Sequence, residues 1–391
     1  MDATITLGPG AINNGSSLLD GFFRTLYNAD NLVINTTDQT ADASTQPVFD
    51  GYDASVTFAG TFPSVDSGTI ASFSIAYDGT EAWSVNGLDI DAAALKSAIE
   101  AAGTIDGGET VNNLFKGINW TMDASLATGP VLAAGTGGDD HFTLTNFNDI
   151  LEYDGGNDVV NMGSGDDTLF FMSFSGLYAD HGVLAINGGR GKDTLAFELA
   201  GNSLTGPDPI AAPTNGGARF NLVAGTVVAN GVPDANTDHY SGFENVVGTD
   251  FADVIRGSDA ANRLIGRGGE DLMIGLGGKD TLTGSDGSNT FKYLAASDSK
   301  TGKGRDVITD FLHGDDHIDL SSLHPATKND KFHFIGENKL QHIGDLHFVL
   351  HNEKGSQHDY TLVEANLSGD ARPELQIELR GLINTAGDFF L

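Results

Sequence analysis

The segment GRGGEDLMIGLGGKDTLTG (266–284) has a nine-residue period, and this period restricts the folds open to the chain. In each unit a glycine is followed five residues later by Asp or Asn and seven residues later by an apolar residue. A fixed short period indicates one small structural unit stacked on itself. We therefore expect a regular coil of short turns and strands.

The period is strict in 248–292 and more eroded in an earlier block. The strict block has opening glycines Gly248, Gly257, Gly266, Gly275 and Gly284, a polar column Asp253, Asn262, Asp271, Asp280 and Asn289, and an apolar column Ile255, Leu264, Met273, Leu282 and Phe291. The earlier block has Asp140, Asp149, Asp158 and Asp167, followed two residues on by Phe142, Leu151, Val160 and Leu169. A further unit at 187–197 carries Asp193 one residue out of phase.

Each unit is too short for a helix and fits a glycine turn followed by a strand of about three residues. Two units then make one turn of the coil, so each strand lies above the strand eighteen residues earlier. The apolar column points inward and fills a thin core.

The same stacking places the acidic residues above one another, for example Asp253 and Asp271. Strands lie about 4.8 Å apart, and two carboxylates at that distance repel by about 3.5 kcal/mol at an effective dielectric constant of about 20. A calcium ion relieves this repulsion because it takes roughly six to eight oxygen ligands, including turn carbonyls. The pattern predicts calcium between the turns, with Asp271 serving the sites above and below.

Composition agrees with a cation-binding protein. The formal charge is −34, from 54 acidic and 20 basic residues, which argues against nucleic acid or an anionic membrane as partner. The absence of cysteine excludes disulfides and thiolate metal sites. The N-terminus has no secretory signal pattern, and no stretch approaches the ~20 apolar residues of a membrane span.

The units resemble the RTX calcium-binding nonapeptide repeat G-G-x-G-x-D-x-U-x over most of 131–198 and 248–292. The resemblance implies a parallel β-roll that holds several calcium ions between turns, with carbonyl ligands from turn glycines such as Gly266, Gly268, Gly275 and Gly277. Asn262 and Asn289 replace Asp, and the unit at 144–152 lacks the glycine pair. We expect weak or empty sites there.

The last hundred residues resemble the C-terminal domain of serralysin-type secreted proteins, both in 290–323 and in the ending Asp388-Phe389-Phe390-Leu391. The resemblance implies a β-rich cap that carries an uncleaved type I secretion signal, and it makes Asp298 and Asp306 candidate calcium ligands. A bacterial extracellular or cell-surface protein that folds on meeting calcium outside the cell is expected.

Eight of the eleven histidines lie between 313 and 358. His347 and His351 would share one strand face, which leaves a transition-metal site open, although we favour scattered surface histidines.

The N-terminal segment predicts a small α+β domain. It has a helix pattern at 16–27, strands at 56–62 and on both sides of Asp78-Gly79, and a helix that begins after Asp91 and ends at Gly103. Between the two repeat blocks, 199–247 predicts a loop and a β-hairpin.

Catalytic signals are sparse. Residues 1–140 contain no His or Cys, and the H-E-x-x-H motif of true serralysins is absent from the chain. Asp89 and Asp91 would suit a glycosidase pair, but we interpret them as helix-capping residues. The aromatic residues Tyr52, Tyr77, Trp83 and Trp120 could stack on sugars, but we favour core packing.

The sequence thus predicts a mainly β protein with five parts. These are an α+β domain (1–130), a first roll (131–198), a connector (199–247), a second roll (248–292) and the cap with its secretion signal (293–391). We expect a non-enzymatic surface-layer, matrix, adhesion or filament protein, with itself or a cell-surface glycan as open partners. A polysaccharide-acting enzyme or a lectin, with its site in 1–130, is the alternative.

Overall fold

The computed structural model describes residues 2–7, 33–35, 40–44, 54–64, 67–77, 80–95, 118–127, 129–135, 137–153, 156–171, 183–197, 217–229, 238–325, 331–352, 359–383 and 387–391. The chain divides into two compact units, one of Met1–Phe171 with Ala179–Asp193, and one of Met172–Tyr178 with Thr194–Leu391.

The first unit begins with an antiparallel sheet. Its strand order is β1 (Asp2–Leu7), β6 (Thr80–Asp91), β5 (Ser67–Tyr77), β4 (Ala54–Ser64), β3 (Thr40–Ser44) and β2 (Val33–Asn35). Tyr77 pairs with Thr80, so the predicted hairpin through Asp78-Gly79 is confirmed. A helical turn at 92–95 follows β6, while the predicted helix at 16–27 lies outside the described residues.

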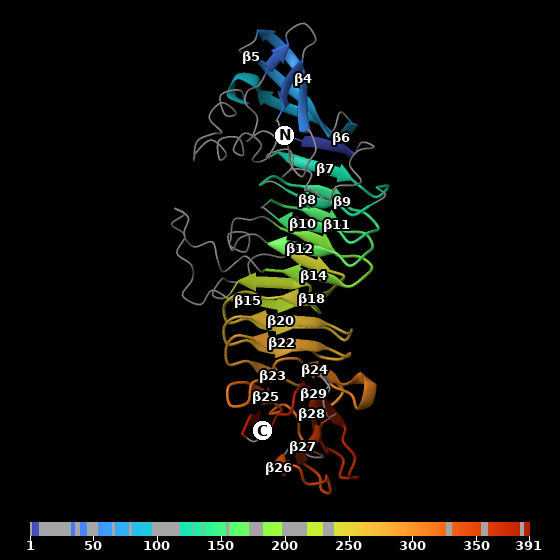
Figure 1. The fold of residues 1–391 in the computed structure, drawn as a ribbon, viewed down its shortest axis with the longest axis vertical. Coiled ribbons are helices and arrows are strands. Elements are labelled where there is room, and N and C mark those ends of the chain that lie inside the picture. The colour runs from blue at the N-terminus through green and yellow to red at the C-terminus, as the bar shows by residue number, and fades with distance from the viewer. Residues whose placement is uncertain are drawn as a thin grey trace. The chain divides into compact units, whose positions relative to one another are not determined.

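The first roll stacks on this sheet through β1, which pairs in parallel with β7 (Asn119–Asp123). One sheet of the roll continues with β9 (His141–Thr143), β11 (Val159–Asn161) and β13 (Ala185–Asn187), and the other contains β8 (Leu132–Ala134), β10 (Ile150–Tyr153) and β12 (Thr168–Phe171). All of these roll strands are parallel. Figure 1 shows the alternation of the two sheets along the chain.

The predicted spacing of eighteen residues is confirmed where Phe142 pairs with Val160 and where Leu151 pairs with Leu169. At the next layer Val160 pairs with Ile186, a spacing of 26 residues. The eight additional residues (26 minus 18) lie between β12 and β13. This insertion explains why the unit containing Asp193 is out of phase in the sequence.

The second unit contains the second roll, again as two parallel sheets. One has β18 (Phe243–Val247), β20 (Arg263–Arg267), β22 (Thr281–Ser285) and β24 (Asp306–Ile308), with β14 (Asp193–Ala196) beside β18. The other has β15 (Ala218–Asn221), β19 (Val254–Arg256), β21 (Leu272–Ile274), β23 (Thr290–Lys292) and β25 (His317–Asp319). β17 (His239–Ser241) precedes β18.

The predicted hairpin in 199–247 is confirmed as β15 with β16 (Thr226–Ala229), which pair in antiparallel fashion. β15 also pairs in parallel with β19. The hairpin therefore supplies a layer of the second roll as well as part of the connection.

The C-terminal residues close this roll by extending both sheets. β29 (Leu375–Arg380) pairs with β24, and β28 (Tyr360–Ala365), β27 (Asp345–His351) and β26 (His333–Phe334) follow outward from β29. In the other sheet β30 (Phe389–Phe390) pairs with β25. A short 3-10 helix, η2 (Gly302–Gly304), lies before β24.

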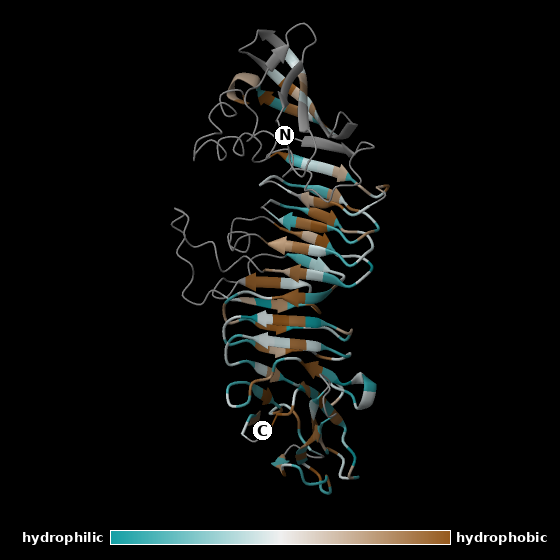
Figure 2. Cartoon of the chain, viewed as in Figure 1, coloured by the Kyte–Doolittle hydropathy of each residue, from teal (hydrophilic) through white to brown (hydrophobic). Residues whose placement is uncertain are grey.

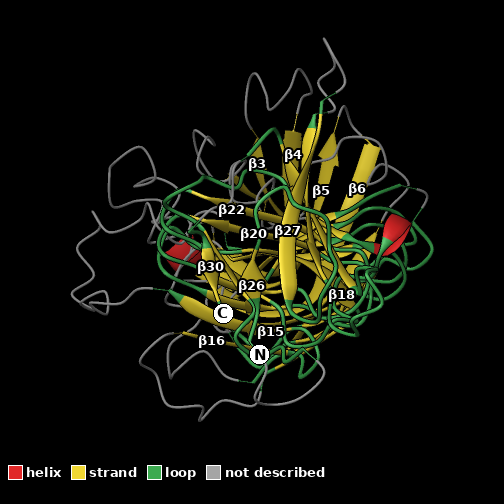
Figure 3. Cartoon of the chain, turned by 90° about the horizontal axis from the view of Figure 1, so that it is seen from below, coloured by secondary structure: helices red, strands yellow, loops and turns green. Residues whose placement is uncertain are grey.

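The core is the apolar column predicted from the sequence. In the second roll Ile255, Leu264, Met273 and Phe291 are completely buried, and Leu282 is 1% exposed. Figure 2 shows brown, hydrophobic bands in the strands of the rolls, and Figure 3 shows that strands and loops make up nearly all of the described chain. Among the described residues, no helix has the length and apolar character needed to cross a membrane.

Candidate metal centre

The polar columns are buried together with the apolar core. Asp140, Asp149, Asp158, Asp167, Asp193, Asp253, Asn262, Asp271, Asp280, Asn289, Asp298 and Asp306 are all buried, and Asp298, at 7% exposed, is the most accessible of them. Burial of so many carboxylates is costly unless each is hydrogen-bonded or bound to a cation. The geometry of these side chains therefore determines what the site can hold.

A ladder of hydrogen bonds connects the carboxylates of successive turns. The backbone N–H of Asp253 donates to Oδ1 of Asp271 at 2.8 Å, and the N–H of Asn262 donates to Oδ1 of Asp280 at 2.8 Å. The first roll has the same contact, from Asp149 N–H to Asp167 Oδ1 at 2.7 Å. One oxygen of each of these carboxylates thus fixes the register of the coil.

The ladder extends beyond the predicted columns. The N–H of Asp280 donates to Oδ1 of Asp306, and the N–H of Asn289 donates to Oδ1 of Asp316. Asp316 is buried and was not predicted, because it follows Asn289 by 27 residues instead of 18. The Asp316-x-Ile318 spacing was the only signal for it in the sequence.

The second carboxylate oxygen has no such partner in several turns. Oδ2 of Asp167, Asp271 and Asp280 is buried without a hydrogen bond. A Cβ atom added to Gly266 would lie 2.0 Å from Oδ2 of Asp271 and 2.8 Å from the carbonyl oxygen of Gly284. Only glycine fits at this close approach of carboxylate and carbonyl, and a buried carboxylate oxygen without a hydrogen-bond donor suits a hard cation such as calcium.

The pKa values reflect this arrangement. Burial, and to a smaller extent neighbouring carboxylates, raises the pKa of Asp167 to about 7, of Asp271 to about 8 and of Asp280 to about 9. Desolvation is thus a larger cause of the raised pKa values than the repulsion between neighbouring carboxylates that the sequence predicted. Without a cation, these groups would hold protons near neutral pH.

Left-handed backbone opens the turns that contain these oxygens. Gly269 and Gly278 have φ values of 100° and 123°, and Arg267 and Leu276 have φ values of 81° and 68°. The glycines predicted as ligands, Gly266, Gly268, Gly275 and Gly277, occupy the first and third positions of the same turns. The residues with left-handed backbone are therefore those at the second and fourth positions of each turn, not the predicted ligand glycines.

At the lower end of the second roll, Asp280 lies near Asp298 and Asp306. Burial raises the pKa of Asp306 to about 8, with a further contribution from the charge of Asp298. Tyr293 is buried beside all three, and burial together with their charges raises its pKa well above its usual range. Oδ2 of Asp298 accepts the N–H groups of Leu294 and Ala295.

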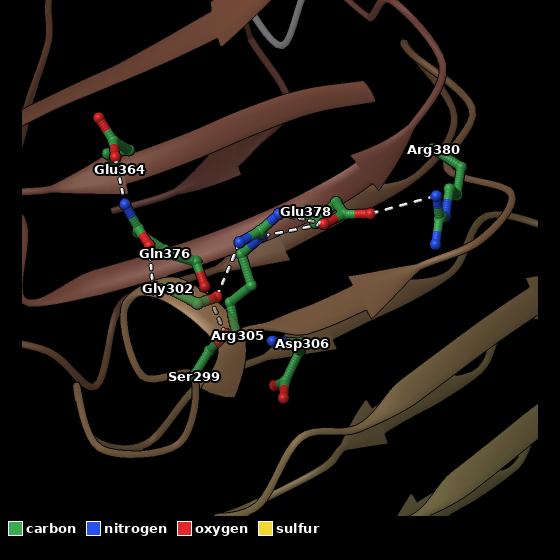
Figure 4. Close-up of polar contacts among 8 residues, drawn as sticks. All are labelled: Ser299, Gly302, Arg305, Asp306, Glu364, Gln376, Glu378 and Arg380. Carbon is green, nitrogen blue, oxygen red and sulfur yellow. Dashed lines mark hydrogen bonds and ion pairs between the residues drawn. The ribbon is translucent and has the colours of Figure 1, made fainter. Parts of the chain in front are cut away.

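A clamp holds the loop before Asp306 against the cap (Figure 4). The Ser299 hydroxyl donates to the Gln376 carbonyl and accepts the N–H of Asp306 at 2.8 Å. The Gly302 N–H donates to the Gln376 side chain. Arg305 binds Glu378 at 2.6 Å. The clamp therefore connects β29 with Asp306, the carboxylate that follows Asp280 in the ladder.

His347 and His351, which the sequence left open as a transition-metal site, have other partners in the structure. His347 is buried, and its two ring nitrogens lie 2.7 Å from the Asn338 carbonyl and 2.8 Å from Glu364. His351 instead stacks on Tyr360. Among the described residues no group of three or more His, Cys, Asp or Glu side chains is placed to hold a metal ion.

The structure also bears on the glycosidase pair and the sugar-stacking aromatic residues that the sequence left as alternatives. Oδ1 of Asp91 accepts the N–H of Ala94 at 2.7 Å, so Asp91 caps the helical turn as interpreted. Trp120 is completely buried and therefore packs in the core. The side chains of Tyr52, Tyr77 and Trp83 lie outside the described residues.

Two family models match parts of this chain. The family model for the RTX calcium-binding nonapeptide repeat matches 134–169, and the model for the Peptidase M10 serralysin C terminal matches 242–391. A solved AlgE6R3 subunit of the mannuronan C5-epimerase from Azotobacter vinelandii is 21% identical, with 37% of this chain and 80% of that chain covered and a TM-score of 0.19. No curated protein gives a significant match.

The fold and the buried oxygens define a calcium-binding β-roll protein. The chain contains RTX calcium-binding nonapeptide repeats and a serralysin-type C-terminal region, and repeats of this kind bind several calcium ions. These two matches indicate a secreted bacterial protein.

Proposed function

We propose that this chain is exported through a type I secretion system, folds when calcium enters its rolls outside the cell, and serves there as a non-enzymatic surface, matrix, adhesion or self-assembling protein. The observation that carries the proposal is the row of buried Oδ2 atoms of Asp167, Asp271 and Asp280 without a hydrogen-bond partner. Such a row fits a roll completed by cations.

The ligands that we assign follow from this row. Oδ2 of Asp271 and the Gly284 carbonyl would hold one ion, and Oδ2 of Asp280 with the Asp306 carboxylate would contribute to another. Asp167 would act in the same way in the first roll. Bound calcium supplies positive charge among oxygens that otherwise carry protons or repel one another.

The calcium concentration on each side of the cell envelope determines where the chain would fold. Binding modules outside cells work at about 0.1 to 1 mM calcium, a concentration that the cytosol lacks. Because ion binding and closure of the roll are coupled, the chain would remain open during export and fold on release. The uncleaved C-terminal signal ending in Asp388-Phe389-Phe390-Leu391 is part of this proposal.

A structural role is supported by the terminal strands of the sheets in the second unit. β16 and β30 lie at the two ends of one sheet, and β26 lies at the end of the other. Free strand edges can pair with another chain. Phe390 and Leu391, about half exposed, add apolar surface at β30.

The calcium proposal is tested by circular dichroism and size-exclusion chromatography of the full chain in EGTA, in about 5 mM calcium and in about 0.5 M NaCl with EGTA. Calcium alone should restore the β spectrum and the compact elution volume, because monovalent salt screens charge but cannot coordinate the buried oxygens. Equal folding in all three conditions would contradict the proposal.

The structural role is tested by negative-stain electron microscopy in about 5 mM calcium. Ordered layers or filaments would support it. A monodisperse monomer that hydrolyses a polysaccharide or binds a glycan array would favour the enzyme or the lectin instead.

A further inference from the structure

The turns that carry the buried carboxylates are of two kinds. In the turns at 162–167, 266–271 and 275–280, the second residue has a left-handed backbone and Oδ2 of the sixth residue has no hydrogen bond. We refer to these as open turns. In the turns at 144–149, 248–253 and 257–262, the second residue is Thr145, Thr249 or Ser258, and none of these three is left-handed. We refer to these as closed turns.

In a closed turn the chain satisfies its own carboxylate. The Thr249 N–H donates to Oδ2 of Asp253 at 2.7 Å, and the Thr249 hydroxyl lies 3.0 Å from Oδ1. The same hydroxyl accepts the Phe251 N–H at 3.1 Å. The turn at 144–149 repeats the arrangement, since the N–H and hydroxyl of Thr145 reach Asp149 at 2.7 Å and 2.8 Å.

The third closed turn uses an amide. The Ser258 N–H donates to Oδ1 of Asn262 at 2.7 Å, and the Asn262 side-chain nitrogen donates to the Glu244 carbonyl at 2.7 Å. A backbone carbonyl that would face a cation in an open turn here accepts an N–H group. This turn therefore has an amide nitrogen where an open turn has its second carboxylate oxygen. The Glu244 carbonyl accepts a hydrogen bond from that nitrogen and does not face a cation.

The difference arises from one peptide group. When the second residue is left-handed, its N–H does not reach the carboxylate of its own turn, and Oδ2 is left among other acceptors. When the backbone is right-handed or extended, the N–H donates to the carboxylate, and a hydroxyl side chain supplies a second donor. Donors bound to both oxygens occupy the positions where a cation would lie.

We propose that the closed turns at 144–149, 248–253 and 257–262 hold no calcium, and that Thr145, Thr249 and Ser258 take the place of the ion. The second roll therefore begins with two ion-free turns, and its first calcium binds at the turn at 266–271. Asp271 serves one ion, because its Oδ1 accepts the Asp253 N–H and the turn above is closed. The inference rests on the proposal that the open turns bind calcium.

The test compares the same substitution in adjacent layers of one column. Asp253→Asn and Asp271→Asn remove the same charge from buried residues one turn apart, and equilibrium dialysis with calcium counts the ions bound per chain. We expect Asp253→Asn to bind as many ions as the unaltered protein and Asp271→Asn to bind at least one fewer. An equal loss in both variants would overturn the inference.

A second variant covers the case in which Asp253→Asn does not fold. Thr249→Val keeps the shape of the side chain and removes the hydroxyl, so it should lower stability without changing the number of ions. A lower ion count in Thr249→Val would mean that the hydroxyl helps to hold calcium and would overturn the inference. If the unaltered protein bound no calcium, the proposed function itself would fail, which distinguishes the two outcomes.

Discussion

At the scale of single residues, the second position of each turn decides how the buried carboxylate is satisfied. Arg267, Leu276 and Ser285 have φ values of 81°, 68° and 67° and recur every nine residues. A left-handed backbone costs a non-glycine residue about 1–2 kcal/mol. At Arg267 and Leu276 the chain accepts this cost in turns whose carboxylate keeps an oxygen without a hydrogen bond, whereas the Ser285 N–H donates to Oδ2 of Asp310.

Two Ser→Gly substitutions at the second position should have opposite effects. Ser285 is exposed and left-handed, so Ser285→Gly should stabilise the roll by roughly 0.5 kcal/mol, after the added flexibility of glycine in the unfolded chain is deducted. Ser258→Gly loses a hydroxyl that accepts the Ala260 N–H, and it should destabilise the roll by about 1 kcal/mol. Urea unfolding in saturating calcium measures both effects, and a shift of the same sign in both variants would contradict the explanation.

At the scale of the element, β29 determines how the roll ends. It pairs in parallel with β24 on one side and in antiparallel fashion with β28 on the other. The Ser299 hydroxyl joins this strand to the N–H of Asp306. Asp306, which we propose as a calcium ligand, is thus positioned by a strand about seventy residues further along the chain.

Ser299→Ala should therefore weaken the end of the roll. The substitution leaves the buried Asp306 N–H without its acceptor, which costs about 1–3 kcal/mol. We expect a lower urea midpoint in calcium and a higher calcium concentration at half folding. Ser297→Ala, at an exposed position two residues away, is the matched control and should change neither value. Equal effects of the two variants would show that the clamp does not position the ligands.

At the scale of the whole molecule, the buried carboxylates make the metal-free protein sensitive to pH. Their pKa values of about 7 for Asp167, about 8 for Asp271 and about 9 for Asp280 exceed the ordinary value of about 3.9. A carboxyl group with a raised pKa takes up protons on folding. Its contribution to stability is complete below about pH 4 and is lost as the pH rises through the folded pKa.

The metal-free protein should thus gain β structure in EGTA as the pH is lowered from about 9 to about 5. Calcium should show the reverse trend, binding more tightly at the higher pH, because protons compete for the same oxygens. Circular dichroism across this range, with and without calcium, measures both trends. A pH-independent spectrum in EGTA would contradict the pKa values of these residues.

Much of the fold was predictable because its repeat is local. The spacing of Ile255, Leu264 and Met273 sets which side chains face inward and places each strand above the one eighteen residues earlier. The insertion before β13 and the extension of the ladder to Asp316 were not predictable, because they depend on how a longer loop returns to the stack.

The sequence by itself determined the period, the inward apolar column, the stacked carboxylates and the relation to RTX and serralysin-type proteins, since each depends on spacing along the chain. Only the tertiary structure decided which carboxylates keep an unpartnered oxygen. That distinction depends on the orientation of one peptide group in each turn and on contacts between successive layers. Both are set by packing of the assembled roll, because Ser258 and Ser285 occupy the same position of the repeat and only Ser285 is left-handed.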